Sequence, residues 1–437
     1  MTVIPTRFPA TGADTAISIT RAVTNHRIGM RLTFGPGQLD PVRLATAVRL
    51  SLDAEPILGC SFRTDERKAC WLRMPRPEEA GYFSAVDSAD PDGDMERFQA
   101  REISDAGPQA AVALFAAEDA DHVGIKVSHV VADGQAAKQY AYLLADIYSR
   151  LATDPSYVPE PNLASRPSGR DVWEHLTSEQ RRESRRAKSW ANPTWVVPSK
   201  GTSGGGLTFR TTFIAPDDFR RLKAYGEQRG ATINDLLLTA VFRACVTLFN
   251  PPAHKPLSLM CTAELRRYLP DPQRLPISNI SISGSLDIEC ADDESFDETL
   301  VRVRERMAVW ARQCYGAGPL ANAEKLAGLG YGLTRVLLGL TFRMAGGSGK
   351  TYPWFTNIGV LDEARLSFDG AVPTSGHMFG PSSNGPAVVP VISTYRDRLA
   401  ISMGFCSEDM DESIIVSVLQ SVAAELGRTA EPVRPIP

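Results

Sequence analysis

The stretch from residue 121 to residue 151 changes from an alternating pattern of apolar residues to a helical one. Val123, Ile125 and Val127 alternate with other residues, which predicts a half-buried strand that ends at His129. From residue 136 to 151, small or apolar residues recur at steps of three and four, which predicts a helix with one apolar face. Asp133 and Gly134 lie between the two, where Asp can cap the helix and Gly allows a close backbone approach. A histidine at this point can leave the packed core and face a cavity.

The same patterns predict further elements on both sides of this stretch. Asp40 and Pro41 are a typical helix start, with Asp as cap and Pro in the first helical position. In the first half we expect strands at 27–34, 60–63 and 111–115, a helix from 41 to about 52, and loop with one amphipathic segment over 85–110. In the second half we expect strands at 207–216, 257–260 and 351–368, helices from 216, 232 and 296, and a final strand-turn-strand-helix.

A proline-rich stretch and a glycine-rich stretch divide these two halves. Residues 155–170 are proline-rich and predict a linker, and residues 200–206, KGTSGGG, predict a flexible connection. Between them we expect one polar helix that carries four arginines: Arg181, Arg182, Arg185 and Arg186. This helix face is either simply solvated or a basic docking surface for a phosphate-bearing donor or an acidic carrier protein.

Composition narrows the class of protein. A chain of 437 residues suggests two large units, and 43% hydrophobic with 22% charged residues is typical of a soluble globular protein. The net charge of -4 gives no reason to expect nucleic-acid binding. The N-terminus has no apolar signal segment, and the apolar stretch 236–249 is too short to span a bilayer, so we expect no membrane span. The seven scattered cysteines predict free thiols in a reducing cytoplasm.

The residues His129-Val-Val-Ala-Asp133-Gly134 resemble the H-x-x-x-D-G signature of the chloramphenicol-acetyltransferase-like acyltransferase superfamily. That superfamily includes peptide-synthetase condensation domains, alcohol acetyltransferases and polyketide-associated acyltransferases. A surface histidine before an N-capped helix is the alternative for so short a motif. Further segments resemble the superfamily in the same order along the chain: GATINDLLLTA from 230, Leu265-Arg266-Arg267, Ser278-Asn279, and Thr356-Asn357-Ile358-Gly359.

The resemblance implies an α/β fold of two chloramphenicol-acetyltransferase-like lobes with an active-site tunnel between them. It implies an N-terminal lobe over 1–165, a linker with the basic helix over 166–206, and a C-terminal lobe over 207–437. His129 is then the catalytic base in mid-tunnel. Asp133, Gly134 and Arg266 are the structural motif residues, with Arg266 reaching back to Asp133.

Two departures from the superfamily qualify the assignment. Peptide-synthetase domains usually carry two adjacent histidines, and here Ser128 stands at the first position; the D-F-G-W-G of plant-type acyltransferases is missing as well.

We expect four further residues to line the tunnel: Ser128, Asn279, Asn357 and His377. The alternative for His377 is a plain loop position. The other histidines lack metal-ligand spacing, so no metal site is expected. GGSGKT at 346–351 lacks the first glycine of a phosphate-binding loop.

The resemblance implies a stand-alone cytoplasmic acyltransferase, of the kind found in natural-product biosynthesis. It would move an acyl group from a thioester, either acyl-CoA or a phosphopantetheine thioester on a carrier protein, to a small alcohol or amine, with no permanently bound cofactor. Two alternatives remain open: a cyclisation or other condensation on a tethered intermediate in the same fold, or a non-catalytic thioester-binding protein.

Overall fold

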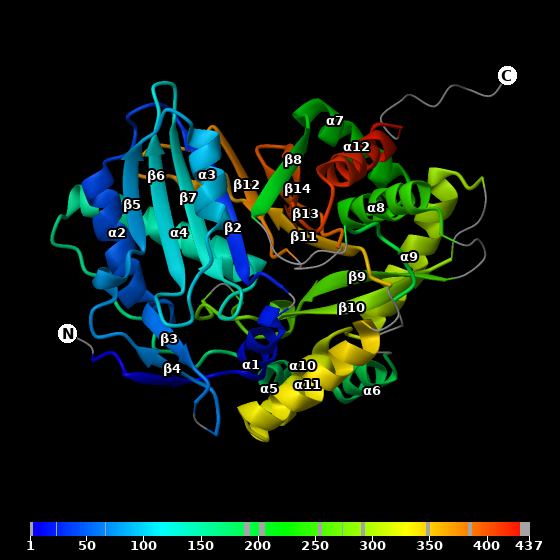
Figure 1. Ribbon diagram of the computed structural model, residues 1–437, viewed down its shortest axis with the longest axis horizontal. Helices are drawn as coiled ribbons and strands as arrows, with labels where there is room; N and C mark the ends of the chain where they lie inside the picture. The colour runs from blue at the N-terminus through cyan, green and yellow to red at the C-terminus, as the bar shows by residue number, and fades with distance from the viewer. Residues whose placement is uncertain are drawn as a thin grey trace.

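The computed structural model describes residues 3–22, 24–65, 67–187, 193–200, 206–251, 256–272, 274–289, 293–346, 350–382 and 387–428. These residues form two lobes that lie side by side, each built on its own sheet (Figure 1). Much of the predicted connection at 200–206 and of the glycine-rich segment at 346–351 lies outside the described residues. The division of the chain at 165 and 206 therefore stays a prediction.

The N-terminal lobe is a five-stranded sheet with one face buried under two long helices. Its strands, in order across the sheet, are β12 (Ser375–Phe379), β2 (Arg27–Phe34), β7 (Asp121–Ser128), β6 (Ala110–Ala116) and β5 (Phe83–Asp87). The even-numbered residues of β2 from 28 to 34 and the odd-numbered residues of β7 from 123 to 127 are buried in one core. That alternation is the period of two that a strand requires. Helices α2 (Pro41–Ala54) and α4 (Gly134–Thr153) fill this core, and α3 (Pro91–Ala100) packs on the opposite face.

The C-terminal lobe is a six-stranded sheet covered by four helices. Its strands are β10 (Ser281–Ile288), β9 (Leu257–Glu264), β11 (Trp354–Val360), β13 (Val391–Tyr395), β14 (Arg398–Cys406) and β8 (Leu207–Ile214), in that order. Its helices are α7 (Pro216–Gln228), α8 (Ile233–Phe249), α9 (Phe296–Arg312) and α12 (Glu412–Arg428). Helix α8 is buried through most of its length and supplies the centre of this lobe's core.

Strand β12 and Lys138 provide two of the contacts between the lobes. Strand β12 comes from the second half of the chain but pairs antiparallel with β2 of the N-terminal lobe, with His377 opposite Arg31. Lys138 of α4 donates to the carbonyl oxygens of Ile358 and Val360 on β11, at 2.9 and 3.2 Å. The lobe interface is therefore held by backbone pairing as well as by side chains.

Shorter elements complete the chain. A small sheet contains β1 (Arg7–Pro9), β4 (Cys70–Arg73) and β3 (Cys60–Arg63). Helices α1 (Gly12–Ile19), α5 (Gly169–His175), α6 (Ser178–Arg186), α10 (Ala317–Gly328) and α11 (Tyr331–Gly346) lie together at the lower edge of Figure 1. The described residues also contain five single turns of 3₁₀ helix: η1 (Thr20–Ala22), η2 (Pro56–Gly59), η3 (Pro77–Ala80), η4 (Arg266–Tyr268) and η5 (Glu363–Leu366).

Three of the differences between the structure and the sequence expectations concern α5 with α6, α1 and β5. The single polar helix expected after the linker is two helices, α5 and α6. The chain breaks because Thr177 starts a new capping box, in which its hydroxyl accepts from the Gln180 amide and its own amide donates to the Gln180 side chain. Helix α1 was not expected, although Thr11 and Asp14 form a capping box there too. Strand β5 lies partly in the stretch expected to be loop.

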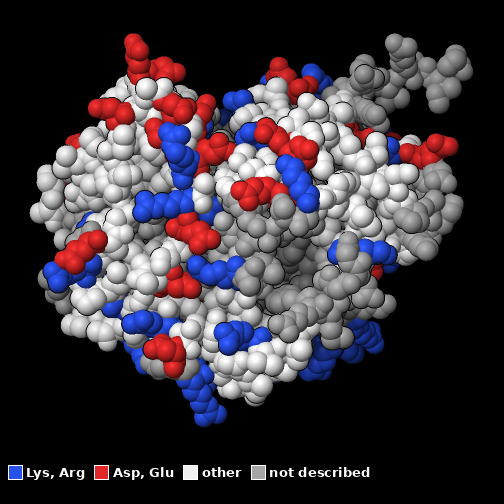
Figure 2. Space-filling view, viewed as in Figure 1, with Lys and Arg blue, Asp and Glu red and all other residues white. Residues whose placement is uncertain are grey.

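Six cysteines are buried and form no disulfide in the described part of the chain, and Cys290 lies outside it. No single helix among the described residues is long and apolar enough to cross a membrane; α7 and α8 pass that test only as a pair, across a bend of 103°. On the face drawn in Figure 2, basic and acidic side chains are interspersed over both lobes.

Candidate active site

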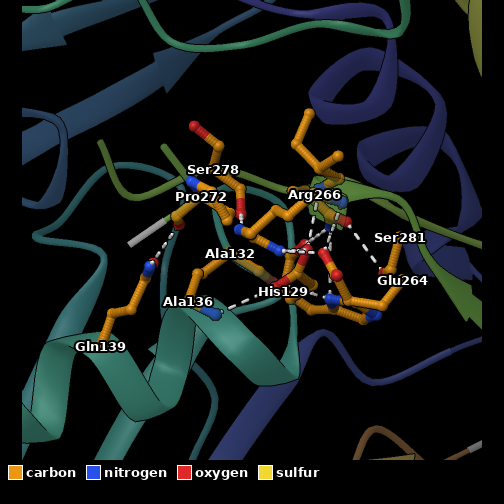
Figure 3. Close-up of polar contacts among 12 residues, drawn as sticks. His129, Ala132, Ala136, Gln139, Glu264, Arg266, Pro272, Ser278 and Ser281 are labelled. Atoms are coloured by element: carbon orange, nitrogen blue, oxygen red, sulfur yellow. Dashed lines mark hydrogen bonds and ion pairs between the residues drawn. The ribbon is translucent and has the colours of Figure 1, made fainter. Parts of the chain in front are cut away.

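His129 is the first residue after β7, and its backbone and ring are both held. Its amide donates to the carbonyl oxygen of His26 at 2.9 Å, which ties the turn to the residue before β2. Its ring Nδ1 lies 2.8 Å from the carbonyl oxygen of Ala132 (Figure 3). Because a carbonyl oxygen can only accept, Nδ1 carries the ring proton and Nε2 keeps its lone pair. The geometry therefore selects the tautomer in which Nε2 is the basic atom.

The surroundings of His129 keep the ring neutral. Burial lowers the pKa of His129 below its usual 6.5, against smaller raising effects of the Ala132 carbonyl and the Asp133 carboxylate. The residue nevertheless keeps part of its surface accessible to solvent. A neutral, partly accessible imidazole with a free Nε2 is the form that can accept a proton at neutral pH.

Asp133 uses both of its carboxylate oxygens for structure. Its Oδ1 accepts from the amide of Ala136 at 2.9 Å and caps α4. Its Oδ2 accepts from Arg266 Nη1 at 2.6 Å and from the amide of Ile280 at 2.8 Å. The side chain is 2% exposed. Asp133 thus joins the start of α4 to two points in the C-terminal lobe and is not free for proton transfer.

Arg266 completes this junction. Besides Asp133, its guanidinium donates to the carbonyl oxygen of Ser278 at 2.6 Å and to Glu264 Oε1 at 3.0 Å (Figure 3). Burial opposes the charge on Arg266, but the two carboxylates together raise its pKa above the ordinary value. The pairing of Arg266 with Asp133 that the resemblance implied is present in the structure.

Asn279 lies between the two residues that this ion pair holds, Ser278 and Ile280. Its Nδ2 donates to the backbone oxygen of His129 at 2.8 Å and lies 3.4 Å from His129 Nδ1. The longer contact is not a hydrogen bond to the ring, because Nδ1 already carries a proton toward Ala132. The ion pair therefore positions Asn279, and Asn279 in turn holds the turn that carries His129.

The other expected site residues are more dispersed. Ser128 is fully buried opposite Arg27 in the β2–β7 pairing. A Cβ on Gly134 would lie 3.1–3.3 Å from the Ile358 side chain, so the start of α4 packs closely on β11. Asn357, next to Ile358, bonds to Asn234 and to the amide of Gly359. None of the contacts of Asn357 in the described chain reaches His129.

His377 lies further along the lobe interface, on β12. It faces Phe213 and Phe379, with ring centroids 5.5 and 4.8 Å apart, in a pocket of about 540 Å³ between the lobes. Burial, together with the nearby Arg31 and Arg398, lowers the pKa of His377 to about 3. His377 pairs with Arg31, four residues along β2 from Arg27, so it is more than 10 Å away from the His129 end of this strand by strand geometry, at roughly 3.3 Å per residue.

Two residues near His129 were missed in the sequence. The ring centroid of His26 lies 6.5 Å from that of His129, and burial, together with His129 and Arg21, lowers the pKa of His26 to about 3. Arg166 donates to the Val131 carbonyl, within the motif turn, and to both carboxylate oxygens of Asp14. Only their approach in space reveals these contacts, because Asp14, His26 and Arg166 lie far from residues 129–134 in the sequence.

Comparison with known proteins rests on structure alone. No protein-family model and no curated protein sequence matches the chain. The first condensation domain of the CDA synthetase superposes with a TM-score of 0.71 at 18% identity, covering 97% of this chain and 96% of that one. Trichothecene 15-O-acetyltransferase from Fusarium sporotrichioides gives a TM-score of 0.74 at 13% identity, over 98% and 95%. A variant starter condensation domain of rhizomide synthetase in complex with C8-CoA gives 0.66 at 16% identity, over 98% and 95%.

The chain has the chloramphenicol-acetyltransferase-like fold. This confirms the predicted α/β architecture of two lobes. In this chloramphenicol-acetyltransferase-like fold, His129, Asp133, Arg266 and Asn279 meet where the two lobes join, although they come from positions up to 150 residues apart.

Proposed function

We propose that the protein is an acyltransferase that moves an acyl group from a thioester to an alcohol or amine, with His129 as general base. The observation that carries this proposal is the state of the His129 ring: Nδ1 is engaged by Ala132, and burial lowers the pKa of His129. A general base must be unprotonated and must offer a lone pair, and Nε2 meets both needs.

The proposed step balances as follows. His129 Nε2 takes the proton of the acceptor O–H or N–H while the acceptor's lone pair attacks the thioester carbonyl carbon. The tetrahedral intermediate collapses, the C–S bond breaks, and the protonated imidazole returns the proton to the leaving thiolate. Asp133 acts in this scheme only through position, because both of its oxygens are bonded.

The donor in this proposal is acyl-CoA or a phosphopantetheine thioester on a carrier protein. The similar starter condensation domain that holds C8-CoA supports a thioester donor. The acceptor is a small alcohol or amine, and no permanent cofactor is part of the scheme.

Product mass tests the proposal. The purified protein would be incubated with acyl-CoA and acyl-phosphopantetheine thioesters of different chain length, each with alcohol and amine acceptors. We expect a product whose mass is that of the acceptor plus the acyl group less one hydrogen, with one free thiol per product. A product formed from one substrate molecule, with a mass lower by one water, would indicate cyclisation instead. Saturable thioester binding without any product would indicate a non-catalytic binding protein.

On the acid side of the pH profile, kcat/KM should begin to fall only at a pH below the usual pKa of histidine. Because burial lowers the pKa of His129 below 6.5, the neutral base persists as the pH falls and is lost only below that value. With an alcohol acceptor, which does not titrate in this range, we expect kcat/KM to be constant from pH 8 to about 6.5 and to fall below it. A Tm that stays above the assay temperature at each pH would exclude acid unfolding as the cause of the fall. A midpoint above 6.5 would contradict the assigned environment of His129.

A further inference from the structure

Arg27, the first residue of β2, is a buried cation without a hydrogen-bond partner in the described part of the chain. The residue is 2% exposed, and none of its three guanidinium nitrogens has a hydrogen-bond partner among the described residues. Burial lowers the pKa of Arg27 to about 9, which still leaves the group charged at neutral pH. A buried, unpaired charge is strongly unfavourable, so such a group is normally paired when the protein works.

Two hydroxyl groups beside Arg27 are also unpartnered in the described chain. Ser128, opposite Arg27 in the β2–β7 pairing, is 0% exposed, and Ser382 is 1% exposed. The carbonyl of Ser382 accepts from the amide of Asn25, two residues before Arg27. Ser382 also lies against Gly404 on β14, two residues from Cys406, which interacts electrostatically with Arg27. The three side chains therefore gather at the same end of β2 and β14.

A second basic side chain lies near Arg27. Lys126, on the same face of the sheet, donates to the carbonyl oxygens of Phe98 and Arg101 at 2.6 and 2.7 Å. The carboxylate of Glu102 raises the pKa of Arg27 electrostatically, but Glu102 is exposed and forms no ion pair with Arg27 in the described structure. Burial, together with Arg27 and Arg101, lowers the pKa of Lys126 to about 7, so this amine is only partly charged at neutral pH. The guanidinium of Arg27 and the two hydroxyls are therefore the groups that favour an anion.

This cluster lies between the motif turn and the interlobe pocket. The carbonyl oxygen of His26, the residue next to Arg27, accepts a hydrogen bond from the amide of His129. In the other direction, Gly29 is covered by the side chain of Gln99, which also forms part of the wall of the 540 Å³ pocket. Three phenylalanines line the same pocket: Phe209, Phe213 and Phe379. Arg27 itself does not line the pocket, so a ligand whose apolar body lies there must pass the Gln99 side chain to bring its charged end to Arg27.

We propose that Arg27, with the hydroxyls of Ser128 and Ser382, binds a carboxylate carried by one of the two substrates. The planar guanidinium presents paired N–H donors that match the two oxygens of a carboxylate. The substrate would then be an acid that keeps one free carboxylate, on either the acyl group or the acceptor. That the bound carboxylate belongs to a substrate rests on the proposed acyl transfer. Binding of the anion itself does not require turnover.

Ligand-induced thermal stabilisation tests the subsite without any reaction. The probes are 3-phenylpropanoate and its neutral counterpart 3-phenylpropanamide, in the millimolar range at matched ionic strength. We expect the carboxylate to raise the Tm of the wild-type protein by about 2 °C or more and the amide to have a smaller effect. Arg27→Met should abolish this difference. No preference for the carboxylate, or the same preference in Arg27→Met, would overturn the proposal.

The Tm of the ligand-free variants gives an independent readout. Arg166 is the matched control, because it is a buried arginine with a full set of partners, including Asp14 at 2.6 Å. Arg166→Met should lower the Tm, since it leaves Asp14 without its main charge partner. Arg27→Met should leave the Tm unchanged or raise it, since it removes an unpaired charge. A fall in Tm as large as that of Arg166→Met would mean that Arg27 is a structural residue and would overturn the proposal.

Selectivity in turnover distinguishes the two sources of the carboxylate. One arm compares a glutaryl with a butyryl thioester, and the other compares an amino-acid acceptor with its amide. In the arm that uses the subsite, Arg27→Met should reduce the ratio of kcat/KM for the carboxylate substrate to that for the neutral one by roughly 10-fold or more. An unchanged ratio in both arms would overturn the proposal. If no pair turns over while carboxylate binding still depends on Arg27, the proposed acyl transfer fails and the anion site stands.

Discussion

Asp133→Ala should lower the free energy of unfolding by about 3–5 kcal/mol. The substitution leaves Arg266, itself 2% exposed, without its buried carboxylate partner. Glu264 contacts the same nitrogen, but its side chain is 43% exposed and shares its charge with solvent, so it compensates only in part. The amides of Ala136 and Ile280 lose their acceptor as well. Urea unfolding, with the Tm as a second measure, would record the loss.

Arg266→Ala should have a similar effect, because it leaves Asp133 buried without its counter-charge. The double variant Asp133→Ala/Arg266→Ala should cost less than the sum of the two single variants, since neither charge is then left alone. Arg150→Ala is a suitable control: its pair with Asp146 is exposed, and its loss should cost less than about 1 kcal/mol. Strict additivity of the Asp133 and Arg266 effects would show that the two side chains do not act as a pair.

The Asp133 and Arg266 variants should lose activity too, because Asn279 loses its position and not because either residue takes part in the reaction. Asp133 holds the amide of Ile280 and Arg266 holds the carbonyl of Ser278, which fixes Asn279 between them. Asn279→Ala should therefore reproduce part of the activity loss with a smaller loss of stability. Its Nδ2 lies against His129, whose ring the carbonyl of Ala132 continues to hold, and its Oδ1 accepts from the Ser281 hydroxyl at 3.3 Å.

Local patterns predicted the elements around the site well. The alternation in β7, the cap at Asp133 and the helical spacing of α4 are all short-range signals, and they place His129 at a strand end. Arg266 and Asn279 could be connected to His129 only through the resemblance, because no periodicity links residues more than 130 positions apart.

The rest of the site depends on tertiary contacts that leave no trace in local sequence. In the sequence, Arg27 is an ordinary polar residue at the start of a strand. Only the structure shows that it is buried and that its guanidinium has no hydrogen-bond partner among the described residues. Arg166 lies in the proline-rich stretch expected to be a linker, yet it bonds to the motif turn. The exchange of β12 into the first sheet could not be predicted either, because strand order depends on long-range pairing.

His129→Ala should lose roughly 10²–10⁴-fold in turnover while it folds almost normally. Within the described chain the ring makes one hydrogen bond, to the Ala132 carbonyl, whereas the bonds that hold the turn come from the backbone of His129 and remain in the variant. The variant therefore separates the chemical role of the ring from the structural role of the motif. Asp133→Ala, by contrast, should change stability and activity together.

The most direct test of the account is the single-turnover rate of acyl transfer by wild type and His129→Ala, with one productive thioester–acceptor pair at saturating enzyme. Product formation and thiol release are followed together, and the Tm of each protein is recorded. We expect the two rates to fall in parallel by at least about 100-fold in His129→Ala, with little change in Tm. A stable His129→Ala protein that transfers the acyl group at the wild-type rate would contradict the assignment of His129 as the base.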